Sequence, residues 1–159
     1  MQKLMITIGL MCACIFANAQ CSELFISEYV EGAGNNKAME IYNPSLNPIN
    51  LSAYRIVRYS NGSSVPSDSF QLSGTINPGQ AWVVVNGQTV NQQNSPACDT
   101  ALQALANQLG GAYPDPMYMN GDDAVCLVKV GTTRVIIDIF GKIGEDPGTC
   151  WTDVFPYTI

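Results

Sequence analysis

Acidic side chains are the main candidates for chemistry in this chain, because the sequence contains no histidine. Without imidazole, the usual general base and the Ser-His and Cys-His nucleophile systems are missing. Glu28, Glu31 and Glu40 lie close together in the sequence, and glycoside hydrolysis uses two carboxyl groups about 5 to 9 Å apart. A carboxylate-based extracellular hydrolase is therefore one hypothesis that the residues raise.

A structural role for these carboxylates competes with that hypothesis. Glu40 stands between Met39 and Ile41 in a segment typical of a β-strand. A carboxylate in that setting is usually held by hydrogen bonds within the fold. We therefore prefer a structural role for Glu40 and its neighbours, with no catalytic residue assigned.

A second group of oxygen ligands lies at Asn120, Asp122 and Asp123. Carboxylate and amide oxygens at a loop tip can bind calcium, although this spacing matches no EF-hand. The same Asn-Gly-Asp-Asp segment also suits a tight turn, in which the Asn side chain bonds the backbone. We take the turn as the default interpretation and calcium as the only cofactor alternative.

The first acidic group belongs to a predicted β-hairpin over residues 24–44. Residues 24–30 and 38–43 are rich in β-branched and aromatic side chains, and the Gly/Asn-rich segment between them tolerates positive φ. Strict alternation would point Glu28 inward, so either a bulge intervenes or this carboxylate is partly buried near a cation. Lys37, Arg55 and Arg58 are the available cations.

Short strands and turns continue to the end of the chain. Alternation and turn residues predict further strands over residues 51–59, 70–72, 81–85, 124–130 and 134–140. The unbroken apolar run at 81–85 predicts a central strand covered on both faces. One amphipathic helix is predicted between Ser95 and Gly110, with Ser95 or Asp99 as its N-cap. This pattern indicates an all-β sandwich or barrel with one short inserted helix.

The first 19 residues are predicted to be a signal peptide. Lys3 supplies a positive start, residues 4–16 a short apolar core, and Ala17 and Ala19 the small residues that signal peptidase requires. The apolar run is too short to span a bilayer, so we expect no transmembrane segment. Cleavage near Ala19 would leave a protein that is secreted or held at the cell surface.

Four cysteines remain after that cleavage: Cys21, Cys98, Cys126 and Cys150. Four cysteines allow three pairings, and the sequence does not choose among them. The chain has no CxxC pair, which disfavours zinc. Because export favours oxidation, we expect one disulfide among Cys98, Cys126 and Cys150.

Charge excludes one class of partner. The net charge of −6 becomes −7 when Lys3 leaves with the signal peptide. A phosphate backbone calls for a basic face, so no nucleic-acid partner is expected.

Several segments in a fixed order resemble the bacterial branch of the lamin-tail domain family. The most specific are Ser27-Glu28, Met39-Glu40-Ile41-Tyr42-Asn43-Pro44, Leu51-Ser52-x-Tyr54 and Asn120-Gly121-Asp122-Asp123-Ala124. The resemblance covers nearly all of residues 22–159. It implies an immunoglobulin-like β-sandwich in which Glu28, Glu40, Asn43, Asp122 and Asp123 are structural motif residues. The chain stops where related domains continue into a further strand segment, so a final strand is expected to be missing.

The resemblance also implies a non-catalytic extracellular module. We expect such a module to bind a protein or carbohydrate ligand, or a neighbouring domain of the same polypeptide. Trp151, Phe155 and Tyr157 could form an aromatic platform for such a ligand, although core packing or a missing partner segment explains them about as well. The alternative remains a carboxylate-based or calcium-assisted extracellular hydrolase.

Overall fold

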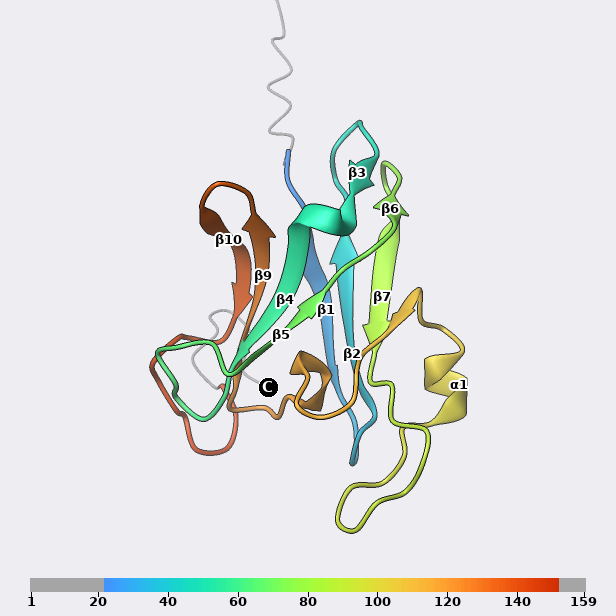
Figure 1. Cartoon of the computed structure of the whole chain (residues 1–159), viewed down its shortest axis with the longest axis vertical. Coiled ribbons are helices and arrows are strands. Elements are labelled where there is room, and N and C mark those ends of the chain that lie inside the picture. The colour runs from blue at the N-terminus through green and yellow to red at the C-terminus, as the bar shows by residue number, and fades with distance from the viewer. Residues whose placement is uncertain (1–21, 152–159) are drawn as a thin grey trace, which may run out of the picture.

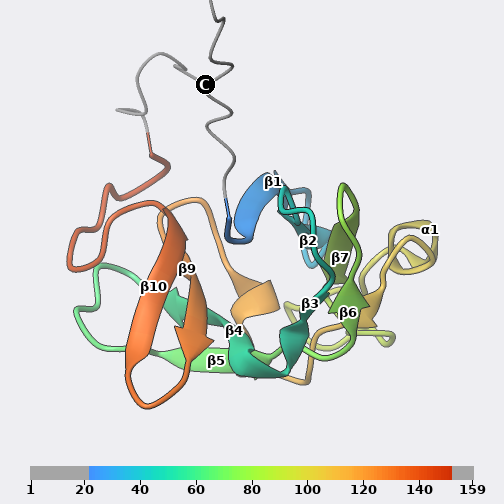
Figure 2. The same cartoon turned by 90° about the horizontal axis from the view of Figure 1, so that it is seen from above.

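The computed structural model describes residues 22–151, which form two facing β-sheets (Figures 1 and 2). Its strands are β1 (Phe25–Glu31), β2 (Lys37–Tyr42), β3 (Ile49–Asn50), β4 (Tyr54–Tyr59), β5 (Asp68–Gln71), β6 (Thr75–Ile76), β7 (Ala81–Val85), β8 (Gln108–Leu109), β9 (Ala124–Val130) and β10 (Arg134–Phe140). Its helical turns are η1 (Leu51–Ala53), α1 (Thr100–Gln103) and η2 (Pro116–Tyr118). The expected all-β immunoglobulin-like sandwich with one short helix is confirmed.

Each of the two main sheets has four strands. The first sheet has the order β1-β2-β7-β8 and the second has the order β10-β9-β4-β5. Strands β3 and β6 form a separate two-stranded ribbon, which lies at one end of the sandwich (Figure 1). The strand pairs are antiparallel within residues 22–151 except for β7 and β8, which run parallel.

The first hairpin is present as predicted, with β1 paired to β2. Its register shifts between Ile26 and Glu28, which is the β-bulge that the sequence left as one of two alternatives. The bulge resets the alternation, so Ile26 packs against the core whereas Glu28 is exposed. No buried carboxylate is needed at this position.

The strands of the second sheet also follow the sequence pattern. The predicted hairpin over residues 124–130 and 134–140 is confirmed as β9 and β10. The predicted strand at 51–59 is shorter, because Leu51–Ala53 form the turn η1 before β4 begins. The side chain of Asn50 caps this turn by accepting a hydrogen bond from the Ser52 amide.

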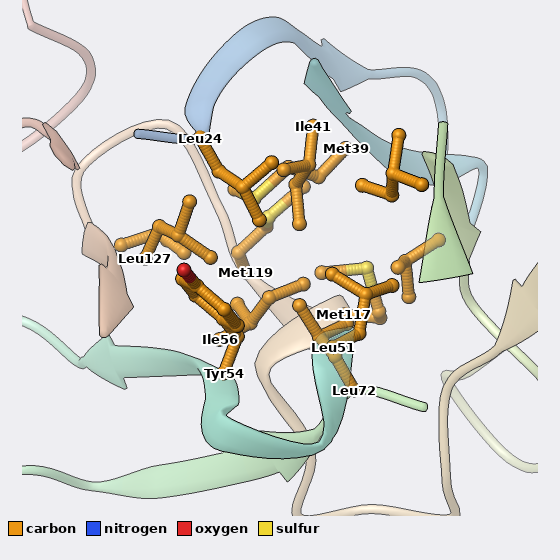
Figure 3. Close-up of a cluster of buried hydrophobic side chains, with 13 residues drawn as sticks. Leu24, Met39, Ile41, Leu51, Tyr54, Ile56, Leu72, Met117, Met119 and Leu127 are labelled. Atoms are coloured by element: carbon orange, nitrogen blue, oxygen red, sulfur yellow. The ribbon is translucent and has the colours of Figure 1, made fainter. Parts of the chain in front are cut away.

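The core lies between the two sheets, and η2 is inserted there (Figures 2 and 3). This turn contacts β2, β4 and β5, and it places Met117 and Met119 among the buried apolar residues. Flexible methionine side chains fill irregular space between sheets of branched residues. The labelled core residues of Figure 3 are Leu24, Met39, Ile41, Leu51, Tyr54, Ile56, Leu72, Met117, Met119 and Leu127.

Side chains connect the sheets at both lateral edges of the sandwich. On one side, Asp138 of β10 accepts a 2.8 Å hydrogen bond from the Ile26 amide of β1, and Tyr29 stacks on Phe140 at 3.9 Å. On the other side, the Gln108 amide of β8 donates to the carbonyl of Gln71 and accepts from Ser73. These contacts cover strand edges that would otherwise be open to pairing with another chain.

The predicted helix between Ser95 and Gly110 is wrong in length. Only Thr100–Gln103 is α-helical, and Asp99 is its N-cap. After this turn, Asn107 exchanges hydrogen bonds with the backbone of Val83, and Gln108–Leu109 pairs with β7. The apolar periodicity of this segment favours a helix, but pairing of β8 with the edge of β7 replaces most of it, as tertiary contacts often override local preference.

The central position predicted for residues 81–85 is confirmed, since β7 lies between β2 and β8. Val84 faces the core between the sheets. On the opposite face, Val85 packs with Ala38 and Cys98, and the α1 residue Leu102 covers them. Both faces of the strand are therefore covered at this end, as its unbroken apolar sequence indicated.

The disulfide expected among Cys98, Cys126 and Cys150 is not formed, and all three are free. Cys98 is buried in an apolar cluster against the first sheet, whereas Cys126 is buried in another cluster on the second sheet. Cys150 is exposed. Separate apolar surroundings, rather than a cross-link, explain the two buried thiols.

The predicted signal peptide at residues 1–19 lies outside the described residues, as do Cys21, Phe155 and Tyr157. Within residues 22–151, no helix is long and apolar enough to cross a membrane.

Candidate functional site

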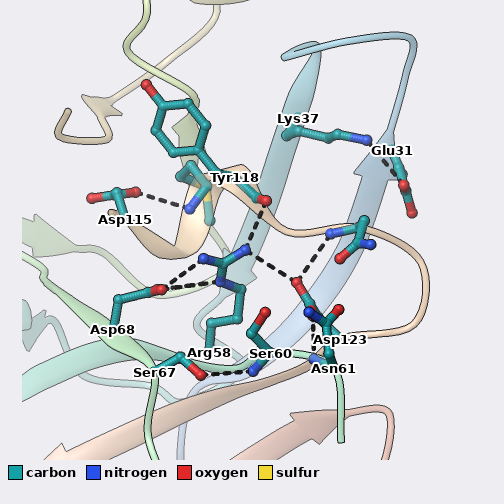
Figure 4. A network of polar contacts seen from close by, with 12 residues as sticks. Glu31, Lys37, Arg58, Ser60, Asn61, Ser67, Asp68, Asp115, Tyr118 and Asp123 are labelled. Carbon is teal, nitrogen blue, oxygen red and sulfur yellow. Dashed lines mark hydrogen bonds and ion pairs between the residues drawn. The ribbon is translucent and has the colours of Figure 1, made fainter. Parts of the chain in front are cut away.

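The most extensive polar contacts surround Arg58 of β4 (Figure 4). Its guanidinium lies 2.7 Å from Asp68 and 3.2 Å from Asp123, and it donates to the carbonyl of Tyr118 at 2.8 Å. The three charged side chains are at most 7% exposed. Burial opposes the charge of Arg58, but the two carboxylates outweigh it and raise the pKa of Arg58.

Both carboxylate oxygens of Asp123 accept hydrogen bonds within this network. One carboxylate oxygen accepts from the Asn61 amide, and the other accepts from Arg58 and from the Asn120 amide. Its backbone carbonyl accepts from the indole of Trp151 at 3.0 Å. Asp123 therefore joins β4, two loops and the end of the described chain, as a structural connector.

The carboxylate next to Asp123 is in a different situation. One oxygen of Asp122 is buried without a hydrogen-bond partner. Partial burial, together with the adjacent Asp123, raises the pKa of Asp122. Across residues 22–151, no group of three or more His, Cys, Asp or Glu side chains is placed to hold a metal. The oxygens of Asp123 are already occupied by Arg58 and by amides, so the predicted trio of Asn120, Asp122 and Asp123 forms a turn and offers no cluster of free ligands.

The acids of the first hairpin lie on an open face. Glu28 and Glu40 are directly opposite each other on β1 and β2, and Glu40 accepts a 2.7 Å hydrogen bond from the Ser27 hydroxyl. Glu31 instead forms an ion pair with Lys37 at 3.0 Å. Neither Glu28 nor Glu40 lines one of the two main surface depressions. Two of the candidate acids thus meet, but without a concave site around them to hold a substrate.

Asn43 has a clear structural role in the loop after β2. This buried amide donates to the carbonyls of Asn47 and Ile76, and its oxygen accepts from both the amide and the hydroxyl of Ser45. All of these partners belong to the turn or to the neighbouring ribbon. The side chain fixes the turn at this end of the sandwich and has no spare donor directed outward.

The larger depression, of about 530 Å³, lies at the same end of the sandwich. It is lined by Ser22, Glu23, Ser45, Leu46, Asn47, Pro48, Ile49, Asn50, Ala53, Tyr54 and Lys129. At its border, Lys129 pairs with Glu23 at 2.7 Å and lies 5.1 Å from the ring centre of Tyr54. The Tyr54 hydroxyl also donates to Glu23. This depression combines apolar and polar groups, as binding sites for ligands do.

A family model described as Lamin Tail Domain matches residues 17–143. The chain belongs to the lamin tail domain family. Comparison with curated proteins finds no match. The family is an immunoglobulin-like, non-enzymatic domain family, which agrees with carboxylates that serve as structural connectors.

Trp151 lies beyond the residues matched by the family model and packs against them. Trp151 is only 5% exposed, and its ring lies close against Gly141, where φ is +82° and a Cβ would come within 2.6 Å of the indole nitrogen. Of the alternatives for Trp151, core packing is therefore the one that the structure shows, and this residue is not part of an aromatic platform. Its buried indole donates a hydrogen bond to the backbone carbonyl of Asp123 and so helps to fix the position of Asp123.

The roles of Arg58 and Asp68 were not predicted from the sequence. The available signal was a charge at an inward position, because Arg58 follows Tyr54 and Ile56 on the same face of a strand. An arginine at such a position requires buried carboxylate partners. Asp68 meets that need from the neighbouring strand β5, 10 residues along the chain, and Asp123 from a loop 65 residues away. The sequence revealed neither contact.

Proposed function

We propose that this lamin tail domain is an exported, non-catalytic binding or attachment module. It would serve a secreted or cell-surface bacterial protein, and its ligand would be a protein, a carbohydrate or a neighbouring domain of the same polypeptide. The observation that carries the proposal is the disposition of the carboxylates. The buried acids Asp68 and Asp123 neutralise Arg58, while Glu28 and Glu40 lie on an open sheet face.

Catalysis by acids requires two carboxyl groups that converge on a bound substrate in a sheltered site. The depressions described for residues 22–151 contain at most one acid each, Glu23 or Asp68, and a basic side chain neutralises both. No observation favours the alternative of a carboxylate-based or calcium-assisted hydrolase. A binding role uses the same surface without any need for a free acid.

A turnover assay tests the non-catalytic proposal directly. The purified full chain would be incubated with chromogenic glycosides and phosphate diesters, with and without millimolar calcium. We expect product at the rate of the buffer blank in every case. Turnover that disappears in Glu40→Gln, while that variant unfolds at the same temperature as the parent, would overturn the proposal.

Export is tested separately. Expression of the full chain in a bacterial host, followed by N-terminal sequencing of the product, should give a mature protein that begins at or beside Gln20. Retention of the product in the cytoplasm with Met1 intact would contradict export and would leave the binding proposal to be judged by the assay above.

A further inference from the structure

Two arginines stand apart from the other basic residues of the chain. Of the seven Lys and Arg residues, Lys3 lies outside the described residues. Four others form ion pairs with carboxylates, namely Lys37, Arg58, Lys129 and Lys142. Arg55 and Arg134 have no acidic partner within residues 22–151, and Arg134 donates only to the neutral hydroxyl of Tyr59 at 3.1 Å. In an acidic protein, two guanidinium groups without an acidic partner leave a local positive charge that can attract an anion.

Both of these arginines line the same depression. It has a volume of about 430 Å³ and is lined by Arg55, Val57, Pro66, Ser67, Asp68, Ser69, Val130 and Arg134. Its one carboxylate, Asp68, is held 2.7 Å from Arg58. The remaining charge in this depression is therefore positive. Two guanidinium groups beside serine hydroxyls provide the donors that a carboxylate or another oxyanion accepts.

The sheet register places this depression on the outer face of the second sheet. Arg55 and Ile136 both lie opposite Val128, on its two sides, and Arg134 lies opposite Val130. Val128 belongs to the apolar cluster that is separate from the core between the sheets. The arginines thus point away from the inner core, along a sheet that stands on the opposite side of the molecule from α1 (Figure 2).

Apolar side chains continue this surface onto β9 and β10. Val130, Ile136 and Ile139 are 40%, 44% and 40% exposed. Ile139 lies opposite Cys126, which belongs to the same cluster as Val128, so these residues share the outer face. Exposed branched residues next to basic groups suit a partner segment that presents apolar and acidic side chains on the same face. No aromatic ring lines the depression, whereas sugar recognition relies on such rings.

We propose that the outer face of the β10-β9-β4-β5 sheet binds an acidic peptide segment, with a carboxylate of the peptide held between Arg55 and Arg134. Apolar residues of the same peptide would lie on Val130 and Ile136. The inference rests on the proposed binding function and gives it a site and a ligand class. Recognition depends on charge-assisted hydrogen bonds, so binding weakens as salt increases.

The test is a titration of the isotope-labelled full chain, followed by amide and arginine Nε–Hε signals in NMR spectra. The probe is a capped peptide of sequence Val-Ser-Glu-Ser-Val, which when extended presents Glu and both Val on one face, and the matched probe replaces Glu by Gln. We expect the acidic probe to shift signals of β4, β5 and β10, with affinity at least fivefold above that of the Gln probe. Higher salt should reduce this difference.

Variants locate the carboxylate contact. Arg55→Gln and Arg134→Lys should each weaken the acidic probe at least fivefold, and Arg134→Lys retains an aliphatic stem over the apolar cluster. The matched control is Lys142→Gln, which removes a charge from an exposed surface pair. It should leave affinity within twofold of the parent.

Several outcomes would overturn the inference. Equal binding of the two probes would show that the carboxylate is not recognised. Weakening by Lys142→Gln as large as that by the arginine variants would indicate unspecific charge attraction. Binding of a sulfated polysaccharide without binding of the acidic peptide would assign the site to another ligand. Peptide shifts confined to the depression around Leu46 and Tyr54 would retain the binding function but refute this site. Turnover in the earlier assay would instead refute the function, whatever this titration shows.

Discussion

Arg58 and Arg55 lie three residues apart on β4 and point to opposite faces of the same strand. Arg58 contacts two buried carboxylates and a carbonyl between the sheets, whereas Arg55 lines an outer depression without an acidic partner. A buried charge must be paired because desolvation is costly, whereas a charge that keeps contact with solvent, as partly exposed Arg55 does, can remain unpaired at much smaller cost. The inner arginine therefore maintains the fold, and the outer one is available to a ligand.

The sharpest test of this difference is to remove each charge while keeping a long side chain. Arg58→Met should lower the free energy of unfolding by about 3–5 kcal/mol, because Asp68 and Asp123 would remain buried without a cation. Urea unfolding at pH 7 measures this loss. Arg55→Met is the matched control and should change stability by no more than about 0.5 kcal/mol, because Arg55 is partly exposed and pairs with no acid of residues 22–151. Similar losses in both variants would contradict the division of roles.

A second test separates charge from hydrogen bonding inside the network. Asp123→Asn keeps an acceptor for the Asn61 amide but loses the charge that faces Arg58. We expect a loss of about 1–3 kcal/mol, typical of a weakened hydrogen bond to a charged group. The measurement is again urea unfolding at pH 7.

The neighbouring carboxylate provides the control for that test. Asp122→Asn should leave stability unchanged or slightly higher at pH 7, because the pKa of Asp122 is raised in the folded state by burial and by Asp123. A raised carboxyl pKa means that ionisation destabilises the fold once the pH rises above the unfolded value of 3.8. If Asp122→Asn were as damaging as Asp123→Asn, the turn as a whole would matter more than the Arg58 contact.

Strands whose limits are set by their own alternation and turn residues could be predicted from the sequence. β9 and β10 alternate and are separated by a short turn, so their limits could be read from residues 124–140. The helix between Ser95 and Gly110 was mostly wrong, because Asn107 and Gln108 bond to strands that are distant in the sequence. Contacts between segments that are distant in the sequence could not be predicted, because they form only when the folded chain brings the segments together.

The candidate site was less predictable than the fold for the same reason. Glu28, Glu40 and Asp123 were predicted to be structural residues from their motifs, but the partners of Asp123 were not predicted. Alternation with Tyr54 and Ile56 places Arg58 on the inward face of β4 and Arg55 on the outward face, but it does not show which acids either arginine meets. Their difference depends on Asp68 and Asp123, which approach only one face.

The pair of Lys129 and Glu23 lies between the two extremes, because it is paired but partly exposed. Partial burial works against ionisation of Glu23, but hydrogen bonds from Lys129, Tyr54 and the Leu24 amide outweigh it and lower the pKa of Glu23. The hydrogen bonds from Lys129 to Glu23 and Tyr54 raise the pKa of Lys129 to about 12. The pair therefore stabilises the fold between pH 4.5 and pH 10.5 and loses this effect as the pH falls below the first value or approaches about 12.

Glu23→Gln should consequently cost about 0.2–1 kcal/mol at pH 7 and low salt, which is the range for exposed pairs. Thermal unfolding of parent and variant at pH 7 and at pH 3 measures the difference, which should shrink towards pH 3 because Glu23 takes up its proton as the pH falls through its lowered pKa. Glu145→Gln, in the exposed pair with Lys142, should cost no more. A difference that is undiminished at pH 3 would mean that Glu23 stabilises the fold through packing. The charge of this partly exposed residue would then contribute nothing measurable to stability, unlike the charge of buried Arg58.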